Sequence, residues 1–170
     1  MTTSATDTFS ARDLLDPAVL LATWGGLGLS PVAPGTIGSL GALPVLWLTA
    51  QLTTVWGLVL IAAIFVLGVG VSERIERTRG GHDQGAIVID EVVGQWLAIA
   101  LPLQLLPGWL SWTEAVVIGF LLFRLFDIVK PPPIGWLDRR VGGGLGVMLD
   151  DVLAGLMAAT LLGVYPLLAN

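Results

Sequence analysis

Long stretches without any charged side chain dominate the pattern of polar and apolar positions. No side chain in Pro17–Ser72 is charged at neutral pH, and the same holds for Val92–Thr113 and Val152–Asn170. A shorter uncharged stretch, Ala115–Phe123, is followed by further apolar residues past Arg124 and Asp127. A helix needs about 20 apolar residues to cross the hydrocarbon core of a bilayer. The pattern therefore predicts helices that are embedded in a membrane.

Turn-forming residues divide these stretches, and we predict an all-α, multihelical integral membrane protein. Breaks fall between Gln51 and Thr54 and at Pro107-Gly108. The first helix is short and contains Pro44, so we expect it to be tilted, kinked or only partly spanning. A further helix at about 13–24 is expected to lie at the membrane interface. The five predicted membrane-embedded helices cover about 37–52, 54–72, 91–107, 112–129 and 151–168.

Composition agrees with a membrane protein and excludes several other classes. Apolar residues make up 55% of the 170 residues, charged residues only 12%, and the mean hydropathy is +0.85. Soluble domains carry roughly 25% charged residues. The high hydrophobicity excludes intrinsic disorder of the whole chain, and a pI of about 4.5 argues against a nucleic-acid partner. The absence of cysteine excludes disulfides, thiolate metal sites and a cysteine nucleophile.

The length suits one domain, and the basic residues indicate its orientation. We expect a disordered polar tail at 1–11 and a single helical membrane domain at 12–170, without a cleaved secretory signal. Five membrane-embedded helices put the two chain ends on opposite faces. The basic residues of 74–79 and 130–140 lie in the loops after the second and the fourth helix, and these two loops are on the same side. The positive-inside rule makes that side cytoplasmic. The glycine-rich segment 30–39 falls on the same face, which predicts a functional site there.

The segment 30–39, SPVAPGTIGS, leads directly into an apolar helix. Backbone N–H groups of such a loop, together with a helix N-terminus, can bind phosphate. The alternative is an ordinary turn with a helix cap. The candidate phosphate-binding residues of this segment are Gly35, Thr36, Gly38 and Ser39.

Two pairs of adjacent acids precede or open apolar helices: Asp90-Glu91 and Asp150-Asp151. The structural alternative is that the acids interact with a helix dipole or cap a helix. One acid suffices for a cap, however, and burying two anions costs free energy unless a cation neutralises them. The pairs therefore favour a metal site. The roles of His82, the only histidine, and of Asp83 stay open.

Three ionisable residues follow at helical spacing: Arg124, Asp127 and Lys130. Because they lie three apart, they share one helical face, and such groups in an apolar helix normally face a cavity or each other. The alternative is a ladder of salt bridges at the helix end. Pro131–Pro133 then ends the helix, since proline lacks the backbone N–H group.

Together these acids form a set of hard oxygen ligands, which favours Mg²⁺, or Mn²⁺, over zinc or copper. Arg124 and Lys130 supply donors for phosphate oxygens, so the expected substrate is a phosphate ester at the membrane surface. We expect the carboxylates to hold one or two ions and one of them to position the attacking water. The candidate metal ligands are Asp90, Glu91, Asp127, Asp150 and Asp151, and the candidate catalytic residues are Asp127, Asp90 and Asp151.

Four segments resemble the bacterial phosphatidylglycerophosphatase A family and occur in the family's order. The resemblance implies a multihelical fold and Mg²⁺-dependent removal of the terminal phosphate from phosphatidylglycerophosphate, giving phosphatidylglycerol, at the inner membrane. Residues 1–29 and 100–114 carry no recognisable signature. The matching segments are PVAPGTIGSL at 31–40, IVIDEVVGQW at 87–96, FRLFDIVKPPPIGWLDRR at 123–140 and GGLGVMLDDVLAG at 143–155.

Two other functions agree less well with the sequence. A CDP-alcohol phosphatidyltransferase also places aspartates and Mg²⁺ at a membrane surface, but its Asp-Gly-x-x-Ala-Arg opening is missing. A transporter or structural membrane protein would carry its ionisable groups at mid-membrane rather than at helix ends on one face. One histidine cannot supply the two that a histidine-based lipid phosphatase of the PAP2 type uses, and no Asp-x-Asp pair exists for a haloacid-dehalogenase-type aspartyl nucleophile. Water, or an aspartate of another kind, is left as the nucleophile. The sequence does not indicate an oligomeric state.

Overall fold

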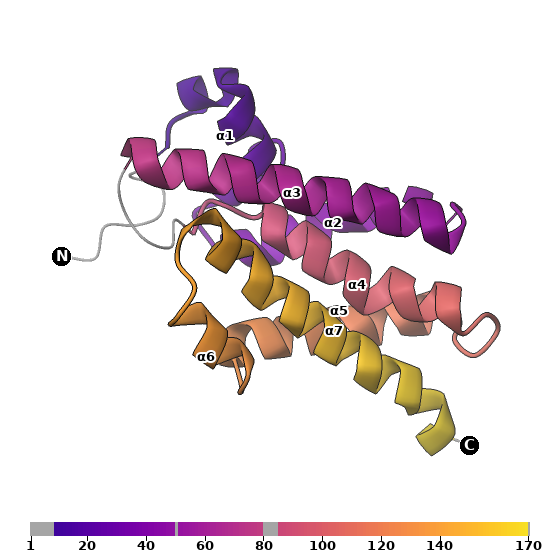
Figure 1. Cartoon of the computed structure of the whole chain (residues 1–170). Coiled ribbons are helices and arrows are strands. Elements are labelled where there is room, and N and C mark those ends of the chain that lie inside the picture. The colour runs from indigo at the N-terminus through magenta and orange to yellow at the C-terminus, as the bar shows by residue number, and fades with distance from the viewer. Residues whose placement is uncertain (1–8, 50, 80–84, 170) are drawn as a thin grey trace.

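The computed structural model describes residues 9–49, 51–79 and 85–169, and all regular structure in these ranges is helical (Figure 1). This confirms the predicted all-α class. The long helices are α2 (Pro34–Thr49), α3 (Thr54–Arg79), α4 (Ile89–Leu105), α5 (Trp112–Val129) and α7 (Gly143–Ala169). Shorter ones are η2 (Ala11–Leu15), α1 (Pro17–Ala22), η3 (Leu27–Leu29) and α6 (Ile134–Asp138).

Local chemistry sets the helix ends. Helix α5 has the predicted bounds because a reciprocal capping box opens it, in which Ser111 Oγ accepts from the Glu114 N–H and Glu114 accepts from the Ser111 N–H. Helix α2 begins at Pro34 rather than at 37, since proline fits the first helical turn. The predicted helix at 13–24 is divided in two, because Asp16 ends η2 and caps α1 by accepting from the Ala18 N–H at 2.9 Å.

Helix α7 corrects the prediction most clearly, because it begins at Gly143 and not at 151. The glycine-rich stretch 143–146, which lies before the predicted start, forms the first turns of this helix. A Cβ at Gly144 would collide with the Val69 carbonyl and lie 2.6 Å from the Glu73 nitrogen. The glycines thus allow α7 to lie against α3, and the Gly144 N–H donates to Glu73 Oε2 at 2.9 Å.

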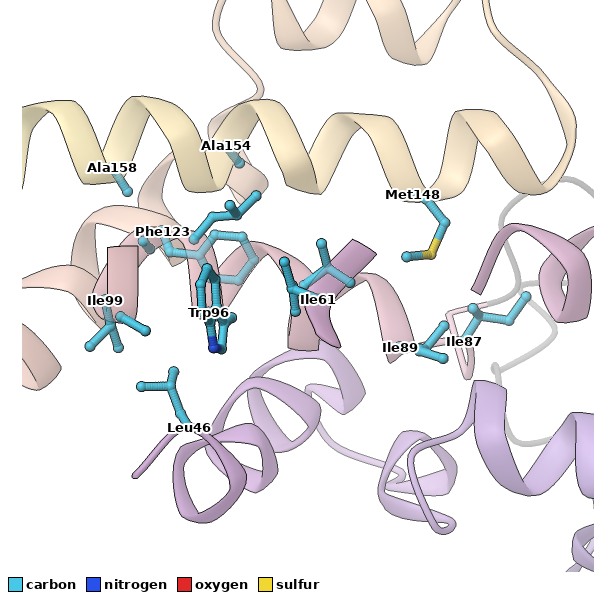
Figure 2. Close-up of a cluster of buried hydrophobic side chains, with 14 of the residues drawn as sticks. Leu46, Ile61, Ile87, Ile89, Trp96, Ile99, Phe123, Met148, Ala154 and Ala158 are labelled. Carbon is cyan, nitrogen blue, oxygen red and sulfur yellow. The ribbon is translucent and has the colours of Figure 1, made fainter. Parts of the chain in front are cut away.

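Helix α4 is the central element, and every residue from Glu91 to Ala100 is buried. It is surrounded by α2, α3, α5 and α7. Figure 2 shows side chains from these helices meeting around Trp96, whose indole N–H donates to Thr49 Oγ1 at 3.0 Å. The core residues labelled there include Leu46 of α2, Ile61 of α3, Ile99 of α4, Phe123 of α5 and Ala154 and Ala158 of α7.

Two glycines let α4 and α7 cross closely. A Cβ at Gly94 would collide with the ring of Phe123 and lie 2.8 Å from the Asp151 carbonyl oxygen, and a Cβ at Gly155 would meet the Gly94 carbonyl. Small residues at such positions allow helix backbones to approach each other. The crossing therefore brings Glu91, one turn before Gly94, next to Asp151 of α7.

By length and composition, two of the described helices can cross a membrane: Thr54–Arg79, with a mean hydropathy of 2.5, and Gly143–Leu167, with 1.8. Only 17% of the most apolar window of α3 is buried, and its exposed side chains include Trp56 and Val66. A largely exposed apolar helix differs from the core helix of a soluble protein and indicates membrane association. The predicted number of five embedded helices is not confirmed.

Helix α1 and the C-terminal end of α7 lie at opposite ends of the helix bundle in Figure 1. Helix α6 lies at the same end as the first turns of α4 and α7. Part of the predicted tail, residues 1–8, lies outside the described residues; Phe9 is buried, with the Arg79 guanidinium 4.7 Å above its ring.

Candidate active site

A cavity of about 450 Å³ opens at the end of the bundle where α6 lies. The N-terminus of α2 contributes Pro34 and Gly35 to its wall, and the charged lining comes from α4, α5, α6, α7 and the turn after α5. The structure thus brings together all the predicted metal ligands and both predicted cations. The lining carboxylates are Asp90, Glu91, Asp127, Asp138, Asp150 and Asp151, and the lining cations are Arg124 and Lys130.

The most concentrated acidic group joins α4 to α7. One carboxylate oxygen from each of Asp90, Glu91 and Asp151 lies within 4.8 Å of the other two. Glu91 is 8% exposed and Asp151 2%. Glu91 Oε2 and Asp151 Oδ2 are buried without a hydrogen-bond partner in the described part of the chain. Asp127 lies close enough to Asp151 for the two carboxyl groups to interact electrostatically.

The buried carboxylate oxygens of this acidic group are suited to a metal ion. Unpaired buried carboxylate oxygens are costly, because burial removes their hydration without replacing it. A divalent cation held by carboxylates would compensate for that cost, and oxygen-only donors suit a hard cation. The residues present therefore fit a divalent metal centre built on Asp90, Glu91 and Asp151.

Helix capping does not explain both acidic pairs. Asp90 and Glu91 do lie in the first turn of α4, and the Glu91 N–H donates to Asp90 Oδ1 at 3.0 Å. Asp150 and Asp151, however, lie well inside α7, which begins at Gly143. The favourable effect of a helix dipole falls off within the first turn. The second pair therefore has no capping role.

Arg124 joins α5 to the acidic group. Its Nη1 atom lies 2.8 Å from Asp127 Oδ2 and 3.7 Å from Glu91 Oε1, and it donates to Ser39 Oγ at 3.3 Å. Ser39 is fully buried and does not line the cavity, so it holds the arginine in place. At Gly35 a Cβ would collide with the Glu91 carboxylate and lie 3.2 Å from Arg124 Nη2; only glycine leaves room for this pair.

Lys130 lies where α5 ends, in a left-handed conformation with φ of 46°. Its Nζ atom is 2.6 Å from Asp150 Oδ2 and 2.7 Å from Asp138 Oδ1. Partial burial by itself lowers the pKa of Lys130, but the hydrogen bonds to Asp138 and Asp150 outweigh burial and raise the pKa above its usual value. Lys130 is thus a fixed cation. The alternative of one salt-bridge ladder holds for Arg124 and Asp127 but does not extend to Lys130.

The remaining candidates differ in position. Thr36 and Gly38 do not line the cavity, and a Cβ at Gly38 would lie 2.6 Å from Val88 Cβ, so this glycine serves helix packing. His82 and Asp83 lie outside the described residues. Sequence reasoning did not select Asp138 as a site residue. The feature that could have indicated it is its position after the proline turn, which brings the chain back to Lys130.

Comparison with known proteins decides the family. The model of a family described as Phosphatidylglycerophosphatase A matches residues 20–165, which include every described site residue. The chain belongs to this family. It is therefore a phosphatase, as the resemblance implied.

Relatives in the family are similar over most of their length. The chain is 42% identical to "Phosphatidylglycerophosphatase A" of Escherichia coli, over 90% of this chain and 86% of that protein. It is 41% identical to the protein of the same name from Haemophilus influenzae, over 85% and 86%. A Bacteroides thetaiotaomicron protein named "Putative phosphatidylinositol-3-phosphatase" is 36% identical, over 86% and 91%. No solved structure matches the chain.

Proposed function

We propose that the chain hydrolyses the terminal phosphomonoester of phosphatidylglycerophosphate, giving phosphatidylglycerol and phosphate, with Mg²⁺. Two relatives carry the corresponding name. The observation that carries the proposal is the group of Asp90, Glu91 and Asp151, whose oxygens gather within 4.8 Å beside two cations at the end of apolar helices. An acidic group of this kind next to Arg124 and Lys130 suits metal-assisted phosphate chemistry.

Asp90, Glu91 and Asp151 would hold Mg²⁺, with Asp127 and Asp150 completing the set of nearby carboxylates. When bound, the ion supplies Lewis-acid polarisation of the phosphoryl group and lowers the pKa of a coordinated water. No histidine is among the described residues of this cavity, so a carboxylate is the available proton acceptor.

The protein's own groups bind and orient the phosphate. Arg124 and Lys130 place positive charge on the cavity wall, where it stabilises the phosphoryl oxygens as the ester bond breaks. The first turn of α2 opens on the same space at Pro34 and Gly35, and free N–H groups at a helix N-terminus favour anions. Hydrolysis forms a bond from the water oxygen to phosphorus and breaks the bond to the glycerol oxygen, which takes up a proton. We assign Asp127, which lies between Arg124 and Asp151, to orienting the water.

The level of the site along the apolar helices supports action on a membrane lipid. Met148 of α7 lies against Gly68 of α3, and Gly144 lies against Val69 and Glu73. This is the level at which the apolar sequence of α3 gives way to its charged end. The positive-inside rule supports a site that faces the cytoplasm, and the family resemblance implies a bacterial inner-membrane location with several embedded helices. The arginines at this end are Arg74, Arg77, Arg79, Arg139 and Arg140.

The test is phosphate release by the detergent-purified chain, with Mg²⁺ and with EDTA. We expect release from phosphatidylglycerophosphate that stops in EDTA, and Glu114→Gln, which removes a capping acid outside the cavity, to retain it. Phosphatidylinositol 3-phosphate is assayed in parallel because one relative carries that name. Folded protein that releases phosphate only from phosphatidylinositol 3-phosphate, or equally well in EDTA, would contradict the proposal.

A further inference from the structure

Two arginines at the rim of the cavity differ from the other arginines at this end of the bundle. Arg139 and Arg140 follow α6 and are both exposed, and the residues on either side of them, Asp138 and Val141, line the cavity. Neither arginine forms a salt bridge with the residues that the structure describes. They therefore offer two uncompensated charges at the mouth of the site.

The neighbouring arginines are neutralised by acids. Arg74 pairs with Asp16 at 2.9 Å, and Arg77 pairs with Glu73 at 2.7 Å. Arg79 pairs with Asp13 at 2.7 Å. Inside the cavity, Arg124 and Lys130 are likewise bound to carboxylates.

Both rim arginines lie beside residues of α6 or of the turn before it. The Arg140 guanidinium lies 5.0 Å from the centre of the Trp136 ring, a cation–π contact. The Arg139 Nη1 atom lies 3.4 Å from the position that a Cβ of Gly135 would take, and the same position is 2.6 Å from the Lys130 carbonyl oxygen. Arg139 thus lies beside the turn that carries Lys130. Trp136 is 51% exposed, as is typical of an indole at a membrane–water interface.

We propose that Arg139 and Arg140 form a subsite for the phosphodiester of the lipid substrate. The inference rests on the proposed function. Phosphatidylglycerophosphate carries a terminal monoester and an inner diester, separated by one glycerol. With the monoester beside Arg124 and Lys130, the diester lies toward the mouth of the cavity, where the free guanidinium groups are. Guanidinium is well suited to phosphate oxygens because its N–H donors are arranged in a planar fork.

The subsite predicts discrimination between two lipid phosphomonoesters. Phosphatidic acid carries a monoester on the diacylglycerol itself and has no phosphodiester, so it makes no use of the rim arginines. Phosphatidylglycerophosphate uses both the cavity and the rim. Losing hydrogen bonds to a charged group corresponds to about a tenfold change in affinity or more.

The experiment compares Arg139→Ala/Arg140→Ala with the unchanged chain on both lipids, in the same neutral detergent micelles with Mg²⁺. We expect kcat/KM on phosphatidylglycerophosphate to fall at least about tenfold, mainly through KM, and kcat/KM on phosphatidic acid to change less than twofold. Arg139→Lys/Arg140→Lys should recover part of the loss. The matched control is Arg12→Ala, an exposed arginine that does not line the cavity, and it should behave as the unchanged chain.

A second measurement covers the case in which the unchanged chain does not cleave phosphatidic acid. Phosphatidylglycerol carries the diester alone, and we expect its inhibition constant to rise about tenfold in the double alanine variant. Inhibition by inorganic phosphate, which binds in the cavity, should not change.

Equal losses on both lipids, or unchanged KM and unchanged inhibition by phosphatidylglycerol, would overturn the subsite while leaving the proposed function intact. Absence of phosphate release from phosphatidylglycerophosphate by the unchanged chain would instead overturn the proposed function.

Discussion

Acids outside the cavity and acids inside it have different surroundings. Outside, Asp13 and Asp16 pair with Arg79 and Arg74, and Glu114 accepts two hydrogen bonds from Ser111. Inside, six carboxylates share two cations, and one oxygen each of Glu91 and Asp151 is buried with no hydrogen-bond partner among the described residues.

This difference separates acids with a structural role from acids with a functional role. An acid that is paired with a cation or caps a helix stabilises the fold locally, and its charge is already compensated. The cavity acids exceed the cations that the described chain offers them, and a cation bound from outside the protein would compensate for their burial.

The largest expected effect comes from removing one cavity charge. Asp151→Asn should lower phosphate release by more than about 100-fold, since even partners one step removed from a metal contribute 10- to 100-fold. In EDTA the variant should unfold at a temperature no lower than the unchanged chain, because the substitution relieves repulsion between acids. Full activity would exclude Asp151 from the metal centre.

A second way to break the comparison is to separate α4 from α7. Gly94→Ala should destabilise the fold by about 1–3 kcal/mol, because its Cβ meets Phe123 and the Asp151 carbonyl. Activity should fall about 10- to 100-fold as the acids shift apart. Thermal unfolding in detergent, with a phosphate-release assay, measures both.

The matched control is Gly70→Ala on α3, where a Cβ meets nothing within 4 Å. Alanine favours the helix there by up to about 1 kcal/mol, so this variant should keep both stability and activity. Equal effects at the two positions would show that the close crossing does not set the geometry of the site.

The smallest effect is expected outside the cavity. Hydrogen bonds from Arg79 and then Ser10 hold the pKa of Asp13 below its usual range. The charged form is therefore stabilised in the folded state, and this contribution is present above the ordinary aspartate pKa of about 3.9 and lost as the pH falls toward the lower folded value.

Asp13→Asn should accordingly lower Tm by less than about 4 °C at pH 7 and leave activity unchanged. The Tm difference should shrink progressively below about pH 4. A Tm difference that grows on acidification would contradict the assignment, and so would a loss of activity.

Sequence patterns predicted the long helices well because uncharged apolar runs, and the turn residues that divide them, are local. The capping box of Ser111 and Glu114, which sets the start of α5, is local as well. The pattern failed at Gly143–Gly146, because the reason for these glycines is the contact with α3, which is remote in sequence. Helix α6 was missed since it has only five residues.

The candidate site likewise has features that are local in sequence and features that depend on remote contacts. The acid pairs and Arg124 were recognisable because ionisable groups are rare in this chain. The partnership of Ser39 with Arg124 and the return of Asp138 to Lys130 depend on tertiary structure, so spacing did not reveal them. Ser39 lies behind the cavity wall, and no local signal distinguishes that position from a phosphate contact.

The central claim is that the cavity acids hold a divalent cation, and metal binding tests it most directly. Calorimetric titration of the detergent-purified, metal-free chain with Mg²⁺, alongside Asp151→Asn and Asp13→Asn, separates cavity acids from the others. We predict saturable binding by the unchanged chain and by Asp13→Asn, and binding weakened at least about tenfold in Asp151→Asn. Equal binding by all three proteins, or no binding by the unchanged chain, would contradict the account.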